Sequence, residues 1–345
     1  MTDRGSYTVN RFSQLVYLPV LSGLGVVNLF IGSFTIFVVA TRSTRHTRAY
    51  NALLLNILCW SFAADFFQAV VGQFEAQWPV PCFRAHGIVG LFNVGGKVLD
   101  SLATLIVVIY CNMIVAAAKP IYFRCVQLMF PSITKSLSWT DGVIYVLCWH
   151  IFFSIAAAYL YISCIVPADY YQAKFENFFK LPRPRSHVTC VVEKSKHKRI
   201  MTVAGLIGFS AQAIAVLIFL VVSAFYLRVE RKKTKISDHT YKLQKAFTKN
   251  LTIITFVPLC FFSLPFMVFI LAFNVSEDYS NYIMSTAELL MCFHDLVVSV
   301  VTLTIYSAYR IATKEYLCCV LGFLKAPQSA IQWLSSNTST IMYIK

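Results

Sequence analysis

The chain has 345 residues, of which 58% are hydrophobic and 13% are charged, and its formal net charge is +15 at pH 7. A water-soluble fold of this composition would lack the polar surface that it needs, which excludes a soluble globular enzyme or binding domain. At this length we expect nearly the whole chain to be a membrane domain, with no room for a separate soluble one.

Seven apolar stretches are each long enough to cross a bilayer, since a membrane helix needs about 20 mostly apolar residues. A helix satisfies its own backbone hydrogen bonds in hydrocarbon. The first stretch is too long for a signal peptide, and no small-residue cleavage site follows it. The sequence therefore predicts an all-α membrane protein, a seven-transmembrane helix bundle with spans at Leu15–Ala40, Tyr50–Val71, Gly87–Ala118, Trp139–Val166, Ile200–Leu227, Asn250–Phe273 and Tyr282–Ala308.

The distribution of Lys and Arg predicts the orientation, because short cytoplasmic loops are enriched in both. Basic residues follow the first, third, fifth and seventh spans, whereas the loop after the sixth has none. The loop 167–199 has eight basic residues and argues against this orientation, but the rule is weaker in long loops. We predict an extracellular N-terminus (1–14), a bundle (15–308) and a cytoplasmic segment (309–345).

The net positive charge predicts partners on both sides of the membrane. On the outer side, loop 167–199 either attracts anionic ligands or is simply solvated. No nucleic-acid-binding motif accompanies the basic loops. On the cytosolic side, the residues between the fifth and sixth spans would face acidic lipid headgroups and an acidic protein partner: Arg228, Arg231, Lys232, Lys233, Lys235, Lys242, Lys245 and Lys249.

Three of the eleven cysteines bear on the outer side. Cys82 precedes the third span and Cys190 lies in the long outer loop, where oxidation is permitted. A disulfide between them would tie this loop over the mouth of the bundle, and Cys164–Cys190 is the rival pairing.

The sixth span contains Pro258 and Pro265, each of which removes a backbone donor and crowds the preceding turn. We expect a kinked helix, which is either a switch that swings its cytosolic end or a static kink filled by neighbours.

After the seventh span, Ile311–Leu324 has the pattern of a short amphipathic helix on the inner leaflet. Cys318 and Cys319 lie within it, and they are either palmitoylation sites or two buried thiols.

Ionisable residues within spans are costly and default to functional candidates. Asp65 lies in the second span, Lys97 and Asp100 share one face of the third, and the seventh contains Glu288, His294 and Asp295. Lys97 could pair with Asp100 or, across helices, with Glu288. The functional interpretation is a polar ligand pocket in the outer half of the bundle with a switch network around Asp65. The structural one is interhelical ion pairing, with an interhelical hydrogen bond for His294.

Enzyme motifs are missing from the sequence. We find no HExxH, GxSxG or Walker loop and no paired metal-binding His motif, so neither catalytic residues, a metal site nor a cofactor is predicted.

Four segments resemble the nematode serpentine chemoreceptors, classes H and I of the Str superfamily of G-protein-coupled receptors. They are listed in chain order: Leu53-Leu54-Leu55-Asn56 leading to Asp65; the Pro-rich entry Pro79–Gly87; Tyr241-Lys242-Leu243-Gln244-Lys245 followed by Pro258; and His294 through Tyr309-Arg310. The chain departs from that pattern at Asp295, where Gly is expected, and at Ala308, where Pro is expected.

The resemblance implies a chemosensory receptor that binds a small external molecule of the odorant or pheromone class and activates a heterotrimeric G protein. It implies a multi-pass protein of the plasma membrane, with the sensory cilium as a candidate location, and a switch network that includes Asp65, Pro258, Tyr309 and Arg310. One alternative is an ion channel or proton-coupled transporter that uses Asp65, Asp100, Glu288 and Asp295 as a relay. Another is a receptor-like chain that assists the assembly of other receptors.

Overall fold

The computed structural model describes most of the chain in nine segments. They are residues 12–42, 48–77, 80–92, 94–130, 139–179, 188–192, 196–233, 238–272 and 277–325.

Seven of the described helical segments are long and apolar enough to cross a membrane, in agreement with the sequence prediction. Three of these spans contain a π-helical segment (η) as well as α-helix. In chain order the spans are built from η1 (Ser13–Tyr17) with α2 (Leu18–Thr41), α3 (Arg48–Asp65) with η3 (Phe66–Gly72), α5 (Gly96–Met129), α7 (Trp139–Ile162), α9 (Lys196–Lys233), α10 (Asp238–Pro258) with η5 (Leu259–Ser263) and α11 (Leu264–Ala272), and α12 (Glu277–Ile305).

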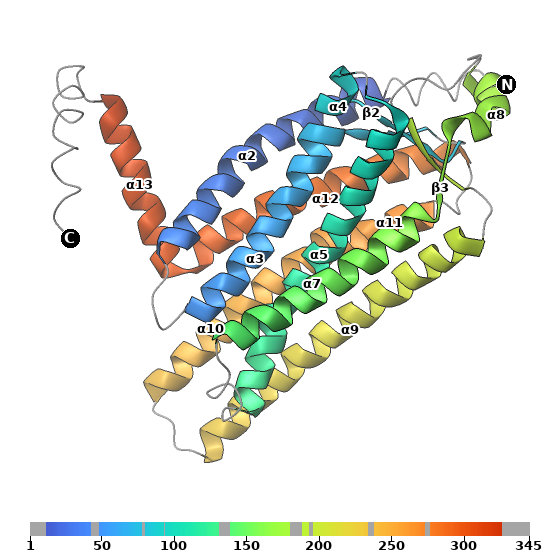
Figure 1. Ribbon diagram of the computed structural model, residues 1–345. Coiled ribbons are helices and arrows are strands. Elements are labelled where there is room, and N and C mark those ends of the chain that lie inside the picture. The colour runs from blue at the N-terminus through green and yellow to red at the C-terminus, as the bar shows by residue number, and fades with distance from the viewer. Residues whose placement is uncertain are drawn as a thin grey trace.

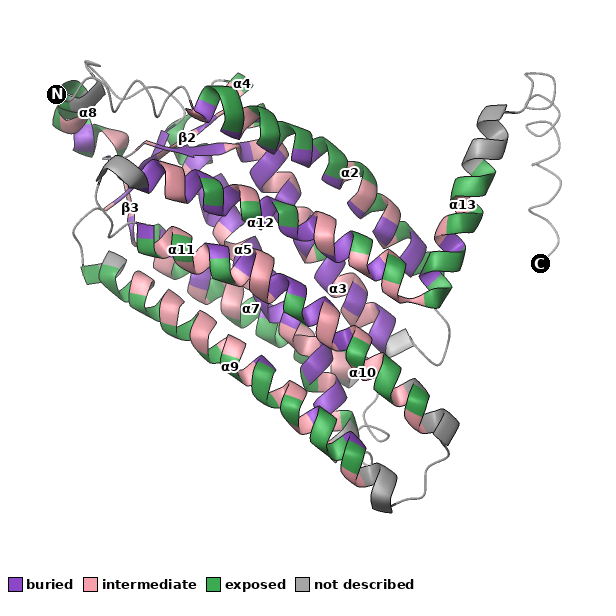
Figure 2. Ribbon diagram, turned by 180° about the vertical axis from the view of Figure 1, so that it is seen from behind, coloured by how far each residue is buried: buried purple, intermediate pink, exposed green. Residues whose placement is uncertain are grey.

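The helix α5 lies in the middle of the bundle, in contact with α3, α7 and α9, while α12 packs against α2 and α11 (Figure 1). The helix α9 is the most peripheral span: 6% of its apolar window is buried, against 56% for α5. Figure 2 shows exposed and half-buried residues along nearly the whole of α9. Since an apolar surface is stable against lipid, this exposure is expected of a helix at the edge of a membrane bundle.

A small sheet covers one end of the bundle, which we call the sheet end. Four short strands pair antiparallel in the order β1-β2-β4-β3. Cys82 on β2 lies opposite Cys190 on β4, and a disulfide joins them, whereas Cys164 is buried and is not part of this disulfide. The strands are β1 (Phe74–Ala76), β2 (Cys82–Ala85), β3 (Ile165–Val166) and β4 (Val188–Val191).

The sheet was not predicted, because the sequence analysis described the chain as all-α. Each strand has two to four residues. That is too few for the alternation of apolar and polar residues to stand out, and the paired strands come from distant loops. The segment between β3 and β4 also includes the 3₁₀ turn η4 (Ala168–Tyr171) and the helix α8 (Gln172–Phe179).

The predicted bounds of the third span, Gly87–Ala118, were displaced toward the N-terminus. The structure has a separate short helix, α4 (Ile88–Leu91), and begins α5 at Gly96. The apolar character is continuous across this break, so hydropathy alone could not locate it. The helix also continues through Pro120, because residues beyond it still pack in the bundle: Ile121 and Cys125 are buried.

The helix after the seventh span, α13 (Ser307–Lys325), begins before the predicted boundary at residue 309 and is longer than Ile311–Leu324. It leaves the bundle at the end opposite the sheet, beside α2 (Figure 1). Glu315 forms an ion pair with Arg42, and the Tyr316 ring contacts Phe34 and Phe37 of α2. These contacts fix the start of α13 against the first span.

Candidate functional site

A cavity of about 510 Å³ lies at the sheet end, within the bundle. This volume is in the range of small-molecule sites, roughly 300–1,000 Å³. Helices α5, α7, α9, α11 and α12 form its walls and strands β1, β2 and β4 contribute to its lining. Most of the lining side chains are aliphatic or aromatic, so the cavity suits a mainly apolar molecule.

One face of α5 forms the longest wall of the cavity. The lining side chains on α5 follow a pattern in which each has a neighbour three or four residues away: Ala103, Ile106, Val107, Tyr110 and Ile114. This spacing places side chains on a single face of a helix. Because α5 is the central helix, this face is directed at the space that α7, α9 and α11 enclose.

The peripheral helix α9 contributes small residues to the opposite wall, among them Gly205 and Gly208. A Cβ atom built on Gly205 would lie 3.2 Å from a methyl carbon of Ile270, whereas one on Gly208 would have nothing within 4 Å. Gly208 lines the cavity and is exposed, so a larger side chain there has room beside the cavity.

The sheet supplies the cavity with side chains from segments far apart in the sequence. Phe74 of β1 and Phe83 of β2 line it together with Thr189 and Val191 of β4. The Cys82–Cys190 disulfide holds β2 and β4 together beside these residues. The disulfide and the antiparallel pairing of β2 with β4 thus fix the position of this part of the cavity wall.

Glu288 of α12 is the predicted site residue that lines the cavity. Its carboxyl group accepts a hydrogen bond from the Gln68 amide, at 3.0 Å, and another from the Tyr17 hydroxyl. The Tyr17 hydroxyl also donates to the Phe74 carbonyl oxygen, at 2.7 Å. These contacts connect the first, second and seventh spans to strand β1.

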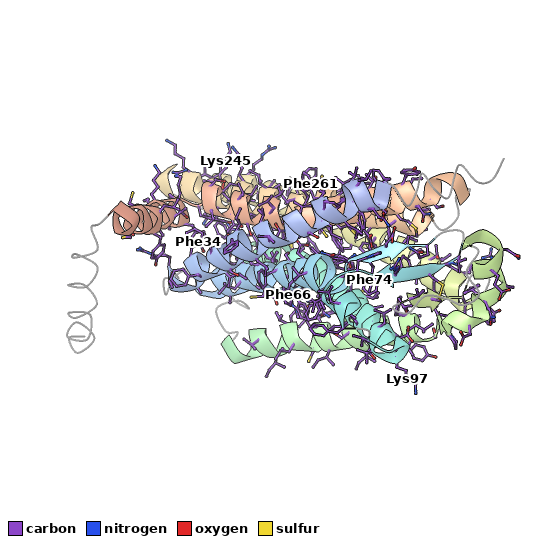
Figure 3. All side chains as sticks on the ribbon, turned by 90° about the horizontal axis from the view of Figure 1, so that it is seen from above. Phe34, Phe66, Phe74, Lys97, Lys245 and Phe261 are labelled. Carbon is purple, nitrogen blue, oxygen red and sulfur yellow. A yellow bond between two sulfur atoms is a disulfide. The ribbon has the colours of Figure 1, made fainter. Side chains whose placement is uncertain are left out.

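Lys97 and Asp100 do not line the cavity, contrary to the sequence hypothesis. Lys97 is exposed and points away from the bundle (Figure 3). Asp100 accepts a hydrogen bond from the Thr189 hydroxyl at 2.7 Å, and so supports strand β4. Asp100 and Glu288 were the expected partners of Lys97, but neither of them forms an ion pair with Lys97. Lys97 lies in the first turn of α5, because this helix begins at Gly96, nine residues after the predicted start of the span.

Asp295 and Asp65 lie together in the bundle interior, outside the cavity lining. The Asn28 amide donates to the Asp65 carboxyl and, at 2.9 Å, to the Cys292 carbonyl oxygen. Asp295 approaches Gly32 so closely that a Cβ there would lie 2.9 Å from one of its oxygens. The first span therefore makes room for the carboxyl that stands where the family pattern has glycine.

His294 is fully buried, but the predicted interhelical hydrogen bond is absent: neither ring nitrogen has a partner among the described residues. The ring instead packs against Phe262 of η5, with 6.0 Å between centroids. His294 thus joins the seventh span to the π-helical turn of the sixth.

At the end opposite the sheet, two tyrosines link the start of α13 to the second span. The Tyr309 hydroxyl donates to the Asn51 side chain at 3.0 Å, and Tyr306 hydrogen-bonds Tyr50. Arg310 is exposed and donates to the Thr304 carbonyl oxygen at 3.3 Å.

Basic residues of the fifth and sixth spans lie at the same end. Arg228 of α9 is exposed, as are Lys242, Lys245 and Lys249 of α10. The side chains of Arg231, Lys232 and Lys233, and the whole of Lys235, lie outside the described residues. Cys318 and Cys319 of α13 are exposed, so they are not the two buried thiols of the alternative interpretation.

The family model of the serpentine type 7TM GPCR chemoreceptor Srh matches residues 13–319, which extend from the first span into α13. The chain belongs to the Srh family. It is a G-protein-coupled chemoreceptor by family, a multi-pass membrane protein with seven spans, and a receptor rather than an enzyme. No curated protein matches this Srh chain.

Sequence reasoning missed two residues of the Srh chain that position Glu288. Tyr17 and Gln68 are polar side chains in the first and second spans, and both are buried. Only Asp, Glu, Lys and His residues within the spans were taken as candidates, and Tyr17 and Gln68 belong to neither the acidic nor the basic residues. A uniform test for every polar residue within an apolar span would have found them, because a buried polar group needs a hydrogen-bond partner.

Proposed function

We propose that this Srh receptor resides in the plasma membrane, binds a small external molecule in the cavity at the sheet end, and switches a heterotrimeric G protein in the cytosol. The observation that carries the proposal is that the cavity is lined by α11, the part of the sixth span that follows Pro258 and the π-helical turn η5. A bound molecule therefore touches the span whose other half, α10, carries the basic residues.

Two independent observations support an extracellular sheet end. The Cys82–Cys190 disulfide is located there, and disulfides persist in oxidising compartments. The exposed cations Arg228, Lys242 and Lys245 lie at the other end, as the positive-inside rule requires of a cytosolic face.

The route from ligand to G protein passes along the sixth span. Phe266, Phe269 and Ile270 of α11 line the cavity. A ligand that packs against them in one arrangement of α11 and not in another shifts the balance between these arrangements. Such coupling between two sites is typically worth about 1–3 kcal/mol. The α10 half, with Lys242, Lys245 and Lys249, then moves relative to α9 and opens or closes a surface for the G protein.

The test is ligand-evoked nucleotide exchange on a purified heterotrimeric G protein by the receptor in lipid nanodiscs. Gly208→Phe places a bulky side chain on the cavity lining, and we expect it to abolish exchange evoked by active compounds from a small-molecule panel. Gly142→Phe is the matched control, because Gly142 of α7 does not line the cavity and a Cβ there also meets nothing within 4 Å.

An unchanged response of Gly208→Phe would remove the cavity from the mechanism. An ion current evoked by the same compounds in liposomes without G protein would instead identify a channel or transporter. That alternative needs a relay of four carboxyl groups, yet Asp100 is bonded to Thr189 in the sheet and Glu288 to Tyr17 and Gln68.

A further inference from the structure

We propose that the ligand of this cavity is an apolar molecule with one basic nitrogen, which pairs with Glu288. The inference rests on the proposed function, because it names the chemical class that the same site takes.

The charge balance of the cavity is the first argument. Among its lining residues Glu288 is the one with a carboxyl group, and no Lys, Arg or His is present. No described cationic side chain lies within 4 Å of the Glu288 carboxyl, since the ion pairs found are Arg42–Glu315 and Glu75–His86. An acid without a counter-charge in an apolar, buried site favours a ligand that brings a positive charge.

The hydrogen bonds of Tyr17 supply the second argument. Its hydroxyl has one proton but lies in contact with two oxygens, the Phe74 carbonyl and the Glu288 carboxyl. Both oxygens can only accept from this hydroxyl, so Glu288 shares the single Tyr17 proton with the Phe74 carbonyl. The other donor to the carboxyl group is the Gln68 amide. Acceptor positions of the buried Glu288 carboxylate are therefore left without a full donor.

These acceptor positions suit an ammonium group. The ligand brings its own proton, so an N–H of the ammonium donates to the Glu288 carboxylate and no proton has to be transferred. Gln68 stays bonded to the carboxylate, and Tyr17 keeps its bond to Phe74. A carboxylate oxygen accepts more than one hydrogen bond, so the ammonium group finds free acceptor positions.

The rest of the cavity defines the remainder of the ligand. Rings of Phe74, Phe83, Phe209, Phe266 and Phe269 surround the space, and hydrophobic burial stabilises a carbon skeleton there. An alcohol of the same skeleton would retain this packing and lose only the ion pair. A carboxylate would face Glu288 without a cation to neutralise it. We therefore expect the preference amine over alcohol over carboxylate.

The test measures dissociation constants of matched compounds for the receptor in nanodiscs. The probes are octylamine, geranylamine and 4-phenylbutylamine, each with the corresponding alcohol and carboxylic acid. The key variant is Glu288→Gln, because its amide can donate to Tyr17 and accept from Gln68, which keeps both contacts but removes the negative charge. Glu288→Asp keeps the charge, and Glu176→Gln repeats the change at an exposed residue of α8.

We expect Glu288→Gln to weaken amine binding by about 100-fold, the effect of removing one partner of a buried charge pair. Alcohol binding should be unchanged, Glu288→Asp should retain the preference for amines, and Glu176→Gln should bind as the unmodified receptor does. Equal affinities for amines and alcohols, an unaltered amine affinity in Glu288→Gln, or no amine binding at all would overturn the proposal. If the alcohols or acids still bind and Gly208→Phe blocks them, the proposed function stands without this ligand class.

Discussion

Two buried carboxyl groups on α12 have very different surroundings. Glu288 has two hydrogen-bond partners and faces a cavity, whereas neither oxygen of Asp295 has a partner among the described residues. Asp295 lies beside Asp65, which the Asn28 amide satisfies in part. Glu288 and Asp295 were predicted to belong to one ligand site. In the structure Glu288 lines the cavity, whereas Asp295 lies with Asp65 and Asn28 in the bundle interior.

A third carboxyl group, Glu75 on β1, lies at the sheet end outside the spans. Burial acts to raise its pKa, but the His86 side chain, with Nε2 2.6 Å from a Glu75 oxygen, and the charge of Arg84 on the paired strand outweigh that effect. The pKa of Glu75 is therefore held below its ordinary value of 4.5. A depressed folded pKa means that the ionised group stabilises the fold at neutral pH and that this contribution disappears in acid.

We predict that Glu75→Gln lowers the free energy of unfolding at pH 7 by about 1–3 kcal/mol, the contribution of a hydrogen bond to a charged group. As the pH falls below 4.5 and through the folded pKa, Glu75 of the unmodified protein becomes protonated too, so the difference should shrink. Thermal unfolding midpoints measured from pH 7 to pH 3.5 check this expectation. Glu176→Gln, at an exposed position, is the control, and a gap that stays constant with pH would contradict the prediction.

Single residues were harder to place than the helices that carry them. Lys97 was expected in the pocket because intramembrane charge is costly, but it lies in the first turn of α5, where it reaches solvent. Tyr17 and Gln68 were not considered, although both bond Glu288. A sequence gives the cost of burying a group, but which groups meet depends on the rotation of each helix, which packing decides.

At the scale of elements, the interruption of the sixth span was the most predictable feature. Pro258 and Pro265 each lack the N–H group that a regular helix needs, and the π-helical turn η5 lies between them. The sheet was unpredictable by comparison, because its order depends on pairing between loops far apart in the chain. The break before α5 could not be predicted from hydropathy, because α4 and α5 are both apolar.

We predict that Pro258→Ala reduces ligand-evoked nucleotide exchange while the affinity of the cavity is retained. Alanine restores a backbone donor and is favoured over proline in a helix interior by about 3 kcal/mol, so it favours one continuous helix and opposes movement about the π-helical turn. Pro120→Ala is the matched control, because Pro120 lies inside α5, which continues through it, and the change leaves the sixth span unaltered. Exchange at the unmodified level in Pro258→Ala would show that the turn is static.

At the scale of the whole molecule, two kinds of observation agree on the orientation. The distribution of basic residues indicated an outer N-terminus, although loop 167–199 argued against it. The structure adds the Cys82–Cys190 disulfide at the end to which that loop belongs. The disulfide supports our proposal that this side is extracellular despite the basic loop, because disulfides persist in oxidising compartments and this criterion is independent of charge.

The orientation can be tested with two lysines at opposite ends of the bundle, Lys97 at the sheet end and Lys245 on α10 (Figure 3). Both are exposed, so cysteine at either position should react with a maleimide that reaches it. In intact cells, a membrane-impermeant maleimide should label Lys97→Cys and leave Lys245→Cys unlabelled until the membrane is permeabilised. Cys318 and Cys319 are replaced by serine in both variants, because they are exposed and would otherwise react after permeabilisation. Labelling of Lys245→Cys alone in intact cells would place the cavity in the cytosol, where an external chemical could not be its ligand, and the proposed function would fail with it.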